Sequence, residues 1–275
     1  MASGITEAMA PSFAGSIGKA ADNTPDALTV GLRQAQAEIV QGHTDTFFAG
    51  NKAHVASETP TSVMHLGDGN KSIQVSIDPA IDDPGITRII QEWWDGLSDG
   101  YQQGLLSSGI KYDVTHHIDA LHPGSNTGIS YPGHYNPETN VATIATHEKY
   151  WSFLTDQHEM QPHSYDVIQQ YLTHESGHGL HRRIAGSGLP VPKEIQEAHA
   201  RDVAKLTDEK RKAYAYYIQG ADSGNDYTQG VTTRSGQLEV IAESLASSQE
   251  KFRQHPDFLS DFPETTALAL KNYLP

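Results

Sequence analysis

Two histidines four residues apart, in the segment His174-Glu175-Ser176-Gly177-His178, constrain this chain more than any other feature of its sequence. On a helix they lie on one face, about 6 Å apart along the axis, and both imidazoles can reach one zinc ion at roughly 2.0–2.1 Å. Glu175 is rotated by about 100° from His174, so it can lie beside the metal without binding it. We therefore expect His174 and His178 to bind zinc and Glu175 to take a proton from a zinc-bound water.

The residues around this motif predict a helix with defined ends. Ser164 supplies a capping hydroxyl, Asp166 adds a favourable charge in the first turn, and Gly186 follows the last turn. Apolar residues recur between these ends at helical spacing. Gly177 and Gly179 weaken a helix by about 1 kcal/mol each, which indicates either close approach of a neighbouring segment or room beside the metal.

A third ligand must come from elsewhere, because catalytic zinc usually has three protein ligands and one open position. The best source is the helical segment 237–246, where Glu239 and Glu243 are four residues apart and share a face with small alanines. Two carboxylates on a largely apolar helix are costly to bury without partners. A metal at Glu239 and a histidine Nδ1–H at Glu243 would satisfy both; the alternative is an amphipathic helix with two solvated acids.

Together the motifs His174-Glu175-x-x-His178 and Glu239-Val-Ile-Ala-Glu243 resemble those of the glutamate-zincin (gluzincin) metallopeptidases, in particular the lethal-factor and Pro-Pro endopeptidase types. The resemblance implies Zn²⁺ as the cofactor, Glu239 as the third zinc ligand and Glu175 as the catalytic base. It implies an endopeptidase that hydrolyses peptide bonds of a protein or peptide substrate by Glu-assisted attack of zinc-bound water. The similarity covers residues 70–255 by the order of elements, and its specific part is the two helices.

One position departs from the family pattern. The family has a tyrosine seven residues before the ligand glutamate, which helps to hold the oxyanion, whereas this chain has Thr232 there. Tyr227, the nearest upstream tyrosine, is our candidate for stabilising the transition state; the alternative is an ordinary loop aromatic. Two other functions stay open: a catalytically inactive zincin-fold binding or effector module, and an aspartate-type zincin that uses Asp226.

The other histidines are expected to be structural or exposed. His181 lies one turn beyond His178 and is expected to be a partly exposed helix residue. His116 and His117, as strand neighbours, would point to opposite faces and would not share a metal. His199 belongs to a long charged helix predicted over 192–218, on a face expected to be solvated.

Hydrophobic periodicity and turn residues predict an α+β fold with a small mixed sheet and a mainly helical C-terminal half. The resemblance implies that this fold is a zincin-like metallopeptidase domain, with the motif helix as its active-site helix. Strands are predicted over 72–77, 110–118, 128–135 and 141–146, a helix over 82–106, and further helices after the motif helix. The tryptophans of the 82–106 helix are expected to anchor the core. Pro132 confines the 128–135 strand to an edge or an irregular position. The segment 140–146 is our prediction for the edge strand that pairs with a substrate peptide.

Composition limits the partners. The net charge of −15 argues against binding nucleic-acid phosphates or anionic lipid. The absence of cysteine excludes disulfides and thiolate metal sites. No stretch of 18 apolar residues is present, so we expect no transmembrane helix and no membrane partner.

Three parts are expected along the chain. Residues 1–29 are rich in small and polar side chains and should be flexible, residues 30–69 should form a helix and a linker, and residues 70–275 should form the metallopeptidase domain. The start lacks the features of an ordinary secretory signal, but its composition resembles the export segment of type III secreted bacterial effectors. We therefore expect a secreted virulence effector that is translocated into a host cell, with a secretion chaperone as the partner of this segment. The alternative is a cytoplasmic protein with a disordered tail.

Overall fold

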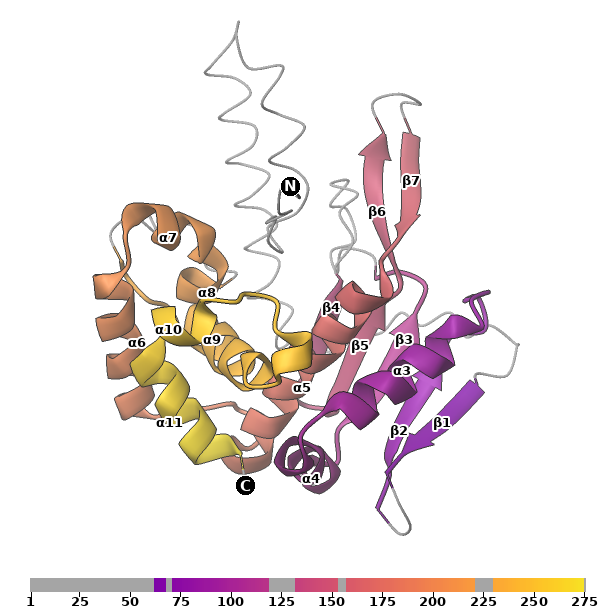
Figure 1. The fold of residues 1–275 in the computed structure, drawn as a ribbon, viewed down its shortest axis with the longest axis horizontal. Helices are drawn as coiled ribbons and strands as arrows, with labels where there is room; N and C mark the ends of the chain where they lie inside the picture. The colour runs from indigo at the N-terminus through magenta and orange to yellow at the C-terminus, as the bar shows by residue number, and fades with distance from the viewer. Residues whose placement is uncertain (1–61, 68–70, 119–131, 153–156, 221–229, 275) are drawn as a thin grey trace, which may run out of the picture.

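Short segments of alternating burial form one mixed sheet. The computed structural model describes residues 62–67, 71–118, 132–152, 157–220 and 230–274. The five strands of the sheet are β1 (Ser62–Leu66), β2 (Ile73–Ile77), β3 (Lys111–Thr115), β4 (Gly133–Asn136) and β5 (Val141–Ala145). Their order is β1-β2-β3-β5-β4, with antiparallel pairs at both margins and parallel pairs in the middle (Figure 1). A mainly helical C-terminal half follows, so the fold is α+β as the sequence predicts.

The outer strand on the β5 side of the sheet is not the one predicted from the sequence. The predicted edge segment 140–146 forms β5, which pairs with β3 on one side and with β4 on the other. The prediction is wrong because the turn after Asn136 folds the two strands into a hairpin with β4 outside. Asn140 closes that turn in a left-handed conformation, with φ of 59° and its N–H donated to the Asn136 carbonyl at 2.9 Å. β4 therefore forms the outer edge on this side of the sheet, which agrees with the edge or irregular position predicted from Pro132.

The opposite margin of the sheet also differs from the prediction. The sequence predicts a helix and a linker over 30–69, whereas residues 62–66 form the strand β1. This strand pairs with β2 from Ser62↔Ile77 to Leu66↔Ile73. The strand is hard to predict because only Leu66 is buried among its five residues. β1 therefore belongs to the same sheet as β2, although the two strands lie on either side of residue 70.

Two helices replace the single one predicted over 82–106. They are α3 (Gly85–Gly96), which lies across the sheet in Figure 1, and α4 (Asp99–Ser108). The chain is extended at Leu97, with ψ of 148°, and the Gln249 side chain accepts a hydrogen bond from the Ser98 N–H at 2.8 Å. A partner distant in sequence thus stabilises the break. Trp93 is fully buried and donates its indole N–H to Thr173 Oγ1 at 2.9 Å, so it anchors the core as expected.

A second antiparallel pair projects from the end of the sheet near the start of the motif helix (Figure 1). It consists of β6 (His147–Ser152) and β7 (Gln157–Pro162), paired from His147↔Pro162 to Ser152↔Gln157. This hairpin is not predictable from the sequence, because its residues are largely polar and lack an apolar alternation.

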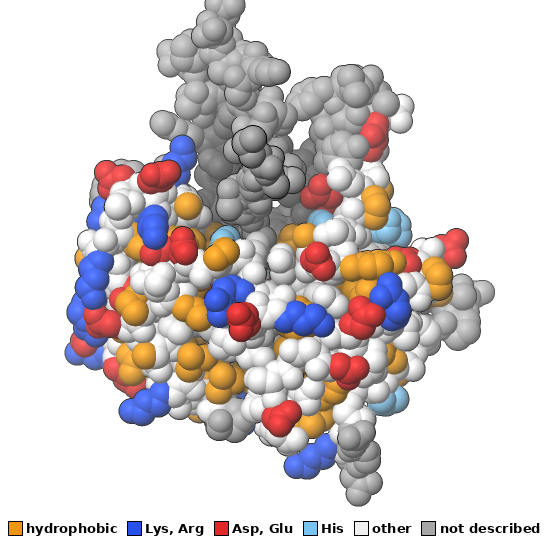
Figure 2. Space-filling model, viewed as in Figure 1, with side chains coloured by type: hydrophobic (Ala, Val, Ile, Leu, Met, Phe, Trp, Pro, Cys, Tyr) orange, Lys and Arg blue, Asp and Glu red, His pale blue; other side chains and the backbone are white. Residues whose placement is uncertain are grey.

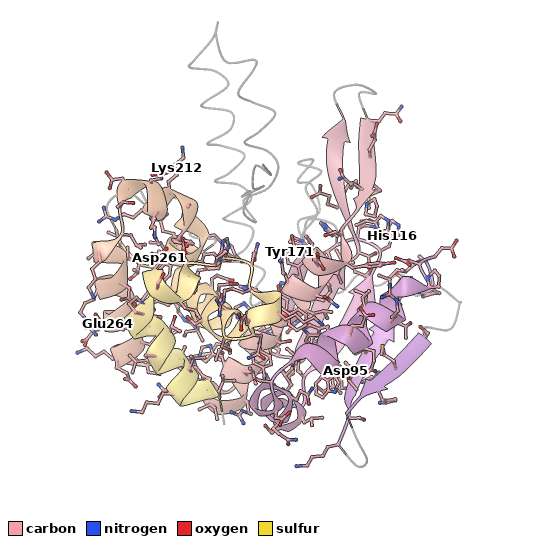
Figure 3. All side chains as sticks on the ribbon, viewed as in Figure 1. Asp95, His116, Tyr171, Lys212, Asp261 and Glu264 are labelled. Carbon is pink, nitrogen blue, oxygen red and sulfur yellow. The ribbon has the colours of Figure 1, made fainter. Side chains whose placement is uncertain are left out.

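Histidines meet at the base of that hairpin, near the position labelled His116 in Figure 3. The His116 ring stacks on His147 with a centroid distance of 4.0 Å, and His116 Nδ1 lies 3.4 Å from His117 Nδ1. Both residues follow the end of β3 at Thr115, so the opposite-face prediction for a strand does not apply to them.

The motif helix α5 (Tyr165–Ala185) is enclosed by the rest of the fold. Its N-cap Ser164 accepts a hydrogen bond from the Val167 N–H at 3.4 Å, and Gly186 ends it with a φ of 82°, as predicted. Every residue from 171 to 181 is buried, since β4 and β5 contact the helix on one side and the C-terminal helix α9 on another. His181 is therefore fully buried rather than partly exposed, and its Nε2 lies 3.3 Å from the Pro190 carbonyl.

The C-terminal half is built from short helices. They are α6 (Lys193–Lys205), α7 (Asp208–Ala213), α8 (Ala215–Gln219), α9 (Arg234–Ser247), the 3-10 turn η2 (Glu250–Phe252), α10 (Phe258–Asp261) and α11 (Pro263–Tyr273). The single helix predicted over 192–218 is thus three helices, with breaks at Leu206 and Tyr214. His199 is fully buried against Phe262, so the prediction of a solvated position for it is wrong.

Ion pairs cover the outside of these helices, where acidic and basic side chains are interspersed (Figure 2). Glu264 of α11, labelled in Figure 3, contacts Arg201 at 2.7 Å and Lys205 at 2.5 Å. Exposed pairs of this kind contribute roughly 0–1 kcal/mol each, so we attribute the stability of this half mainly to its buried contacts. Among the described helices, none combines the length and the apolar character that a bilayer crossing needs.

Candidate metal centre

A glycine contact lets the two motif helices meet. A Cβ atom on Gly177 of α5 would lie 2.7 Å from the Cα of Ala242 on α9, a distance that no side chain tolerates against backbone. A Cβ on Gly179 would similarly meet the side chain of Ile110 at 2.6 Å. Close approach of neighbouring segments therefore accounts for both glycines. The contact at Gly177 places the carboxylates of Glu239 and Glu243 opposite the histidines of α5.

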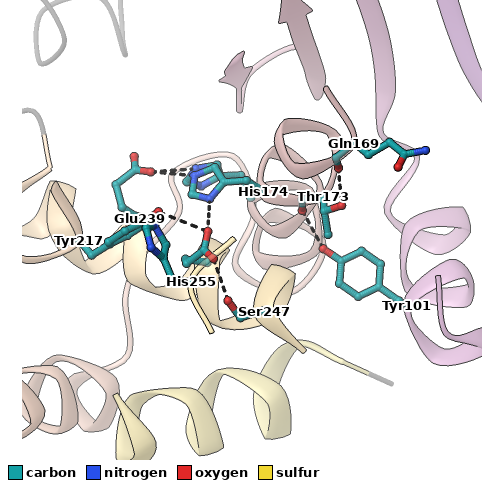
Figure 4. A network of polar contacts seen from close by, with 10 residues as sticks. Tyr101, Gln169, Thr173, His174, Tyr217, Glu239, Ser247 and His255 are labelled. Atoms are coloured by element: carbon teal, nitrogen blue, oxygen red, sulfur yellow. Dashed lines mark hydrogen bonds and ion pairs between the residues drawn. The ribbon is translucent and has the colours of Figure 1, made fainter. Parts of the chain in front are cut away.

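Three buried side chains from these helices converge on one point (Figure 4). Glu239 Oε2 lies 3.1 Å from His174 Nε2 and 3.5 Å from His178 Nε2. One ligand atom from each residue lies within 4.8 Å of the other two. The side chains of His174 and Glu239 are only 5% and 6% exposed, so solvent water does little to stabilise the charge of the carboxylate. Such a set of two imidazoles and one carboxylate could hold a metal ion.

The charges in this group depend on one another. Burial alone would lower the pKa of His174, but hydrogen bonds with Glu239 and Glu243 outweigh it and raise that pKa well above its usual range. Burial would raise the pKa of Glu239, yet the charge of His178 and the hydrogen bonds from both histidines hold it well below its usual range. Without a cation, protons on the imidazoles must balance the buried carboxylate. A divalent cation that displaced those protons would satisfy the same atoms.

Glu243 fixes the orientation of the first imidazole. The carboxylate is 1% exposed, and its Oε2 lies 3.0 Å from His174 Nδ1. Its Oε1 accepts a hydrogen bond from Ser247 Oγ at 2.8 Å. The alternative of two solvated acids on this helix is therefore wrong. With its hydrogen on Nδ1 directed at Glu243, a neutral His174 would present the lone pair of Nε2 to a bound metal, as a metal ligand requires.

His178 is held by packing. Its ring stacks on Tyr135 of β4 with a centroid distance of 5.8 Å and an interplanar angle of 15°. Its Nδ1 is buried and has no hydrogen-bond partner among the described residues. The position of its Nε2 beside Glu239 thus depends on the contact between α5 and the edge strand.

Glu175 lies between the ligand group and the edge strand β4. A Cβ on Gly133 of β4 would be 2.6 Å from Glu175 Oε1, so any larger residue there would push this carboxylate out of its present position. Burial raises the pKa of Glu175, the charges of His174 and His178 oppose that shift, and Glu239 adds to it. A buried carboxyl group with a raised pKa, next to a possible metal position, is suited to exchanging protons.

The donor set fits zinc. Two imidazole nitrogens and one carboxylate oxygen are a common catalytic zinc set, and the carboxylate at His174 Nδ1 is the usual outer partner of a metal-binding histidine. The site therefore meets the chemical requirements that the sequence implies. The chain matches no family model, and neither a curated protein nor a solved structure matches it. Its function is therefore inferred from these side chains.

Some predicted positions cannot be compared. Tyr227 and Asp226 lie outside the described residues, as do the predicted segment 1–29 and residues 30–61 of the predicted helix and linker. Tyr217 of α8 lies at the site but is not among the site residues predicted from the sequence. Its hydroxyl lies 3.5 Å from Glu243 Oε2, and its ring centroid lies 6.4 Å from that of His174. Its signal in the sequence is weak, because Tyr214, Tyr216 and Tyr217 all fall in one short aromatic run.

Proposed function

We propose that this chain is a zinc-dependent endopeptidase of the glutamate-zincin type, which acts on an extended segment of a protein substrate. The observation that supports it is the buried group of His174, His178 and Glu239 with the Glu175 carboxylate beside it. These residues match, position by position, the roles that the sequence motifs imply. A purely structural cluster would not require a further buried acid, Glu175, next to the three candidate ligands.

The side chains divide the chemistry between them. His174, His178 and Glu239 would hold the zinc ion, which when bound supplies a Lewis acid that lowers the pKa of water and polarises a carbonyl group. Glu175 takes a proton from the attacking water and passes it to the leaving amine. Its raised pKa favours the second of these transfers, because the protonated form is the one that donates.

The edge strand supports a peptide as the substrate. β4 offers an outer backbone edge next to Glu175, and Gly133 brings that edge close to the carboxylate. An extended peptide that paired with β4 would use main-chain hydrogen bonds and would place one of its carbonyl groups near the acid. We therefore assign substrate binding to β4, in place of the 140–146 segment.

Peptide-library digestion followed by mass spectrometry tests the proposal. The zinc-loaded protein should cleave peptides, a chelator should stop the cleavage, and Glu175→Gln should retain zinc while losing roughly 10²–10⁴-fold in rate. The exposed Glu250→Gln is the matched control and should cleave as the unmodified protein does. Zinc binding without any cleavage would instead indicate a binding module. Full activity in Glu175→Gln would refute the assignment of the base.

A further inference from the structure

A line of buried and partly buried polar side chains continues behind the candidate metal centre (Figure 4). Tyr217 OH lies 3.5 Å from Glu243 Oε2 and 3.2 Å from His255 Nε2. Glu243 in turn contacts His174 Nδ1 and Ser247 Oγ. The line thus runs from the segment between η2 and α10, through α8 and α9, to the first imidazole of α5.

Only one arrangement of hydrogens suits this line. A phenol hydroxyl has one hydrogen and can also accept. If Tyr217 gave its hydrogen to His255, it would face the Glu243 carboxylate with lone pairs only, which is repulsive. If His255 Nε2–H donates to Tyr217, the Tyr217 hydrogen is free for Glu243. Histidine, tyrosine and serine then all direct donors toward one buried carboxylate.

The fold holds Tyr217 in place from several sides. Its ring packs edge-on against His255 at 5.4 Å and against Phe258 at 5.1 Å. The end of α8 is fixed to the start of α9, since Thr233 donates its N–H to the Ile218 carbonyl at 3.1 Å and its hydroxyl to the Gln219 carbonyl at 2.7 Å. A Cβ on Gly236 would lie 2.6 Å from Gln219 N, so these helices also meet through a glycine.

We propose that Tyr217 and His255 are positioning residues, which hold Glu243 and through it keep His174 Nε2 directed at the metal. This inference rests on the proposed metal-dependent function. The hydroxyl of Tyr217 does not touch the metal ligands; it acts on the carboxylate that orients one of them. Tyr217 and His255 therefore set the affinity of the centre for its metal.

The test is the zinc affinity of variants, measured by competition with a chromogenic chelator. Tyr217→Phe keeps the ring and removes only the hydroxyl, and we expect it to weaken zinc binding by roughly 10-fold, the lower end for loss of an outer partner. Tyr214→Phe is the matched control, because the Tyr214 hydroxyl bonds to Asp261 Oδ2 at 3.0 Å in the same aromatic cluster. It should bind zinc as tightly as the unmodified protein.

His255 provides the second variant and a rescue. His255→Leu removes the donor and should weaken binding as Tyr217→Phe does, whereas His255→Gln keeps an N–H donor and should restore most of the affinity. The double variant Tyr217→Phe/His255→Leu should lose no more than the weaker-binding single variant, because both act through Glu243. ¹⁵N chemical shifts of the His255 ring should show the tautomer with hydrogen on Nε2.

The outcomes separate this inference from the proposed function. An unmodified protein that takes up no stoichiometric zinc would refute both. A protein that binds zinc, with equal affinity in Tyr217→Phe and His255→Leu, would refute the positioning role alone. So would a His255 ring with hydrogen only on Nδ1.

Discussion

Asp202 and Glu239 are both buried carboxylates in the helical half of the chain, but their surroundings differ. Asp202 of α6 is completely buried and accepts hydrogen bonds from the N–H and the hydroxyl of Thr265, each at 2.8 Å. Those donors belong to the first turn of α11, so the acid caps a helix. Glu239 of α9 instead faces the Nε2 atoms of His174 and His178. Neutral imidazoles with hydrogen on Nδ1 would offer it no donor at all.

The difference distinguishes an acid with complete hydrogen-bond partners from an acid that could bind a metal ion. Asp202 has fixed partners that are complete without any further group. Glu239 faces the Nε2 atoms of two histidines, which in the neutral form with hydrogen on Nδ1 have lone pairs directed at the carboxylate. Shared protons or a bound cation would remove the resulting repulsion. Burial alone would not have separated these two residues. The identity of the atoms opposite each carboxylate does.

The largest expected effect comes from exchanging each acid for its amide. Glu239→Gln should weaken zinc binding by more than the roughly 100-fold that loss of an outer partner costs. Asp202→Asn should leave zinc affinity unchanged. It should lower the free energy of unfolding by about 1–3 kcal/mol, because an NH₂ group in place of a carboxylate oxygen would face the buried donors of Thr265. Isothermal titration and urea denaturation measure the two quantities. Loss of zinc binding in Asp202→Asn, with zinc binding kept in Glu239→Gln, would contradict the roles assigned to the two acids.

Zinc itself should stabilise only the protein that has Glu239. At a free concentration about 100 times the dissociation constant, zinc should raise the free energy of unfolding by roughly 2.7 kcal/mol. The increment should survive in Asp202→Asn and disappear at the same zinc concentration in Glu239→Gln. Thermal unfolding with and without a chelator provides the measurement. An equal zinc effect in both variants would place the metal elsewhere.

Gly177→Ala tests whether helix contact brings Glu239 into place. The new Cβ would overlap the Ala242 backbone, and we expect a loss of about 1–3 kcal/mol in the free energy of unfolding together with weaker zinc binding. Gly188→Ala is the control, since a Cβ there meets no atom within 4 Å. Unchanged zinc affinity in a folded Gly177→Ala protein would mean that the contact does not position the ligand.

Acid pH should lower the free energy of unfolding through His199, which lies on α6 with Asp202. Burial lowers the pKa of His199 from 6.5 to about 3. Between pH 6.5 and about pH 3 the imidazole binds a proton in the unfolded chain but not in the folded one. The contribution of His199 to the free energy of unfolding is therefore fully present above pH 6.5 and falls as the pH drops toward 3. The slope from this residue is about 1.4 kcal/mol per pH unit.

The measurement is the free energy of unfolding against pH in the metal-free Glu239→Gln background, which removes much of the ionic coupling at the site. His199→Leu should have a shallower slope than that background. Equal slopes with and without His199 would show that this histidine is not buried in its neutral form.

Local signals predicted much of this structure, whereas partners distant in sequence decided the rest. Ser164 and Gly186 mark the ends of α5 because caps act within one turn. The spacing of Glu239 and Glu243 was enough to expect one carboxylate at the metal and one at a histidine. The break at Leu97 was not predictable, since it is stabilised by Gln249. The outer place of β4, the burial of His199 and the contacts of Tyr217 likewise depend on tertiary packing.

The enclosure of α5 has a consequence for biosynthesis. The sheet and α5 leave the ribosome before α9, so the nascent chain carries two imidazoles and an uncovered glycine face while the acid is still missing. A product that stopped before Arg234 would have no carboxylate at position 239 and would expose that face to water. The three candidate ligands are thus present together only after α9 has been synthesised, so metal binding at this group would have to follow the synthesis of both helices.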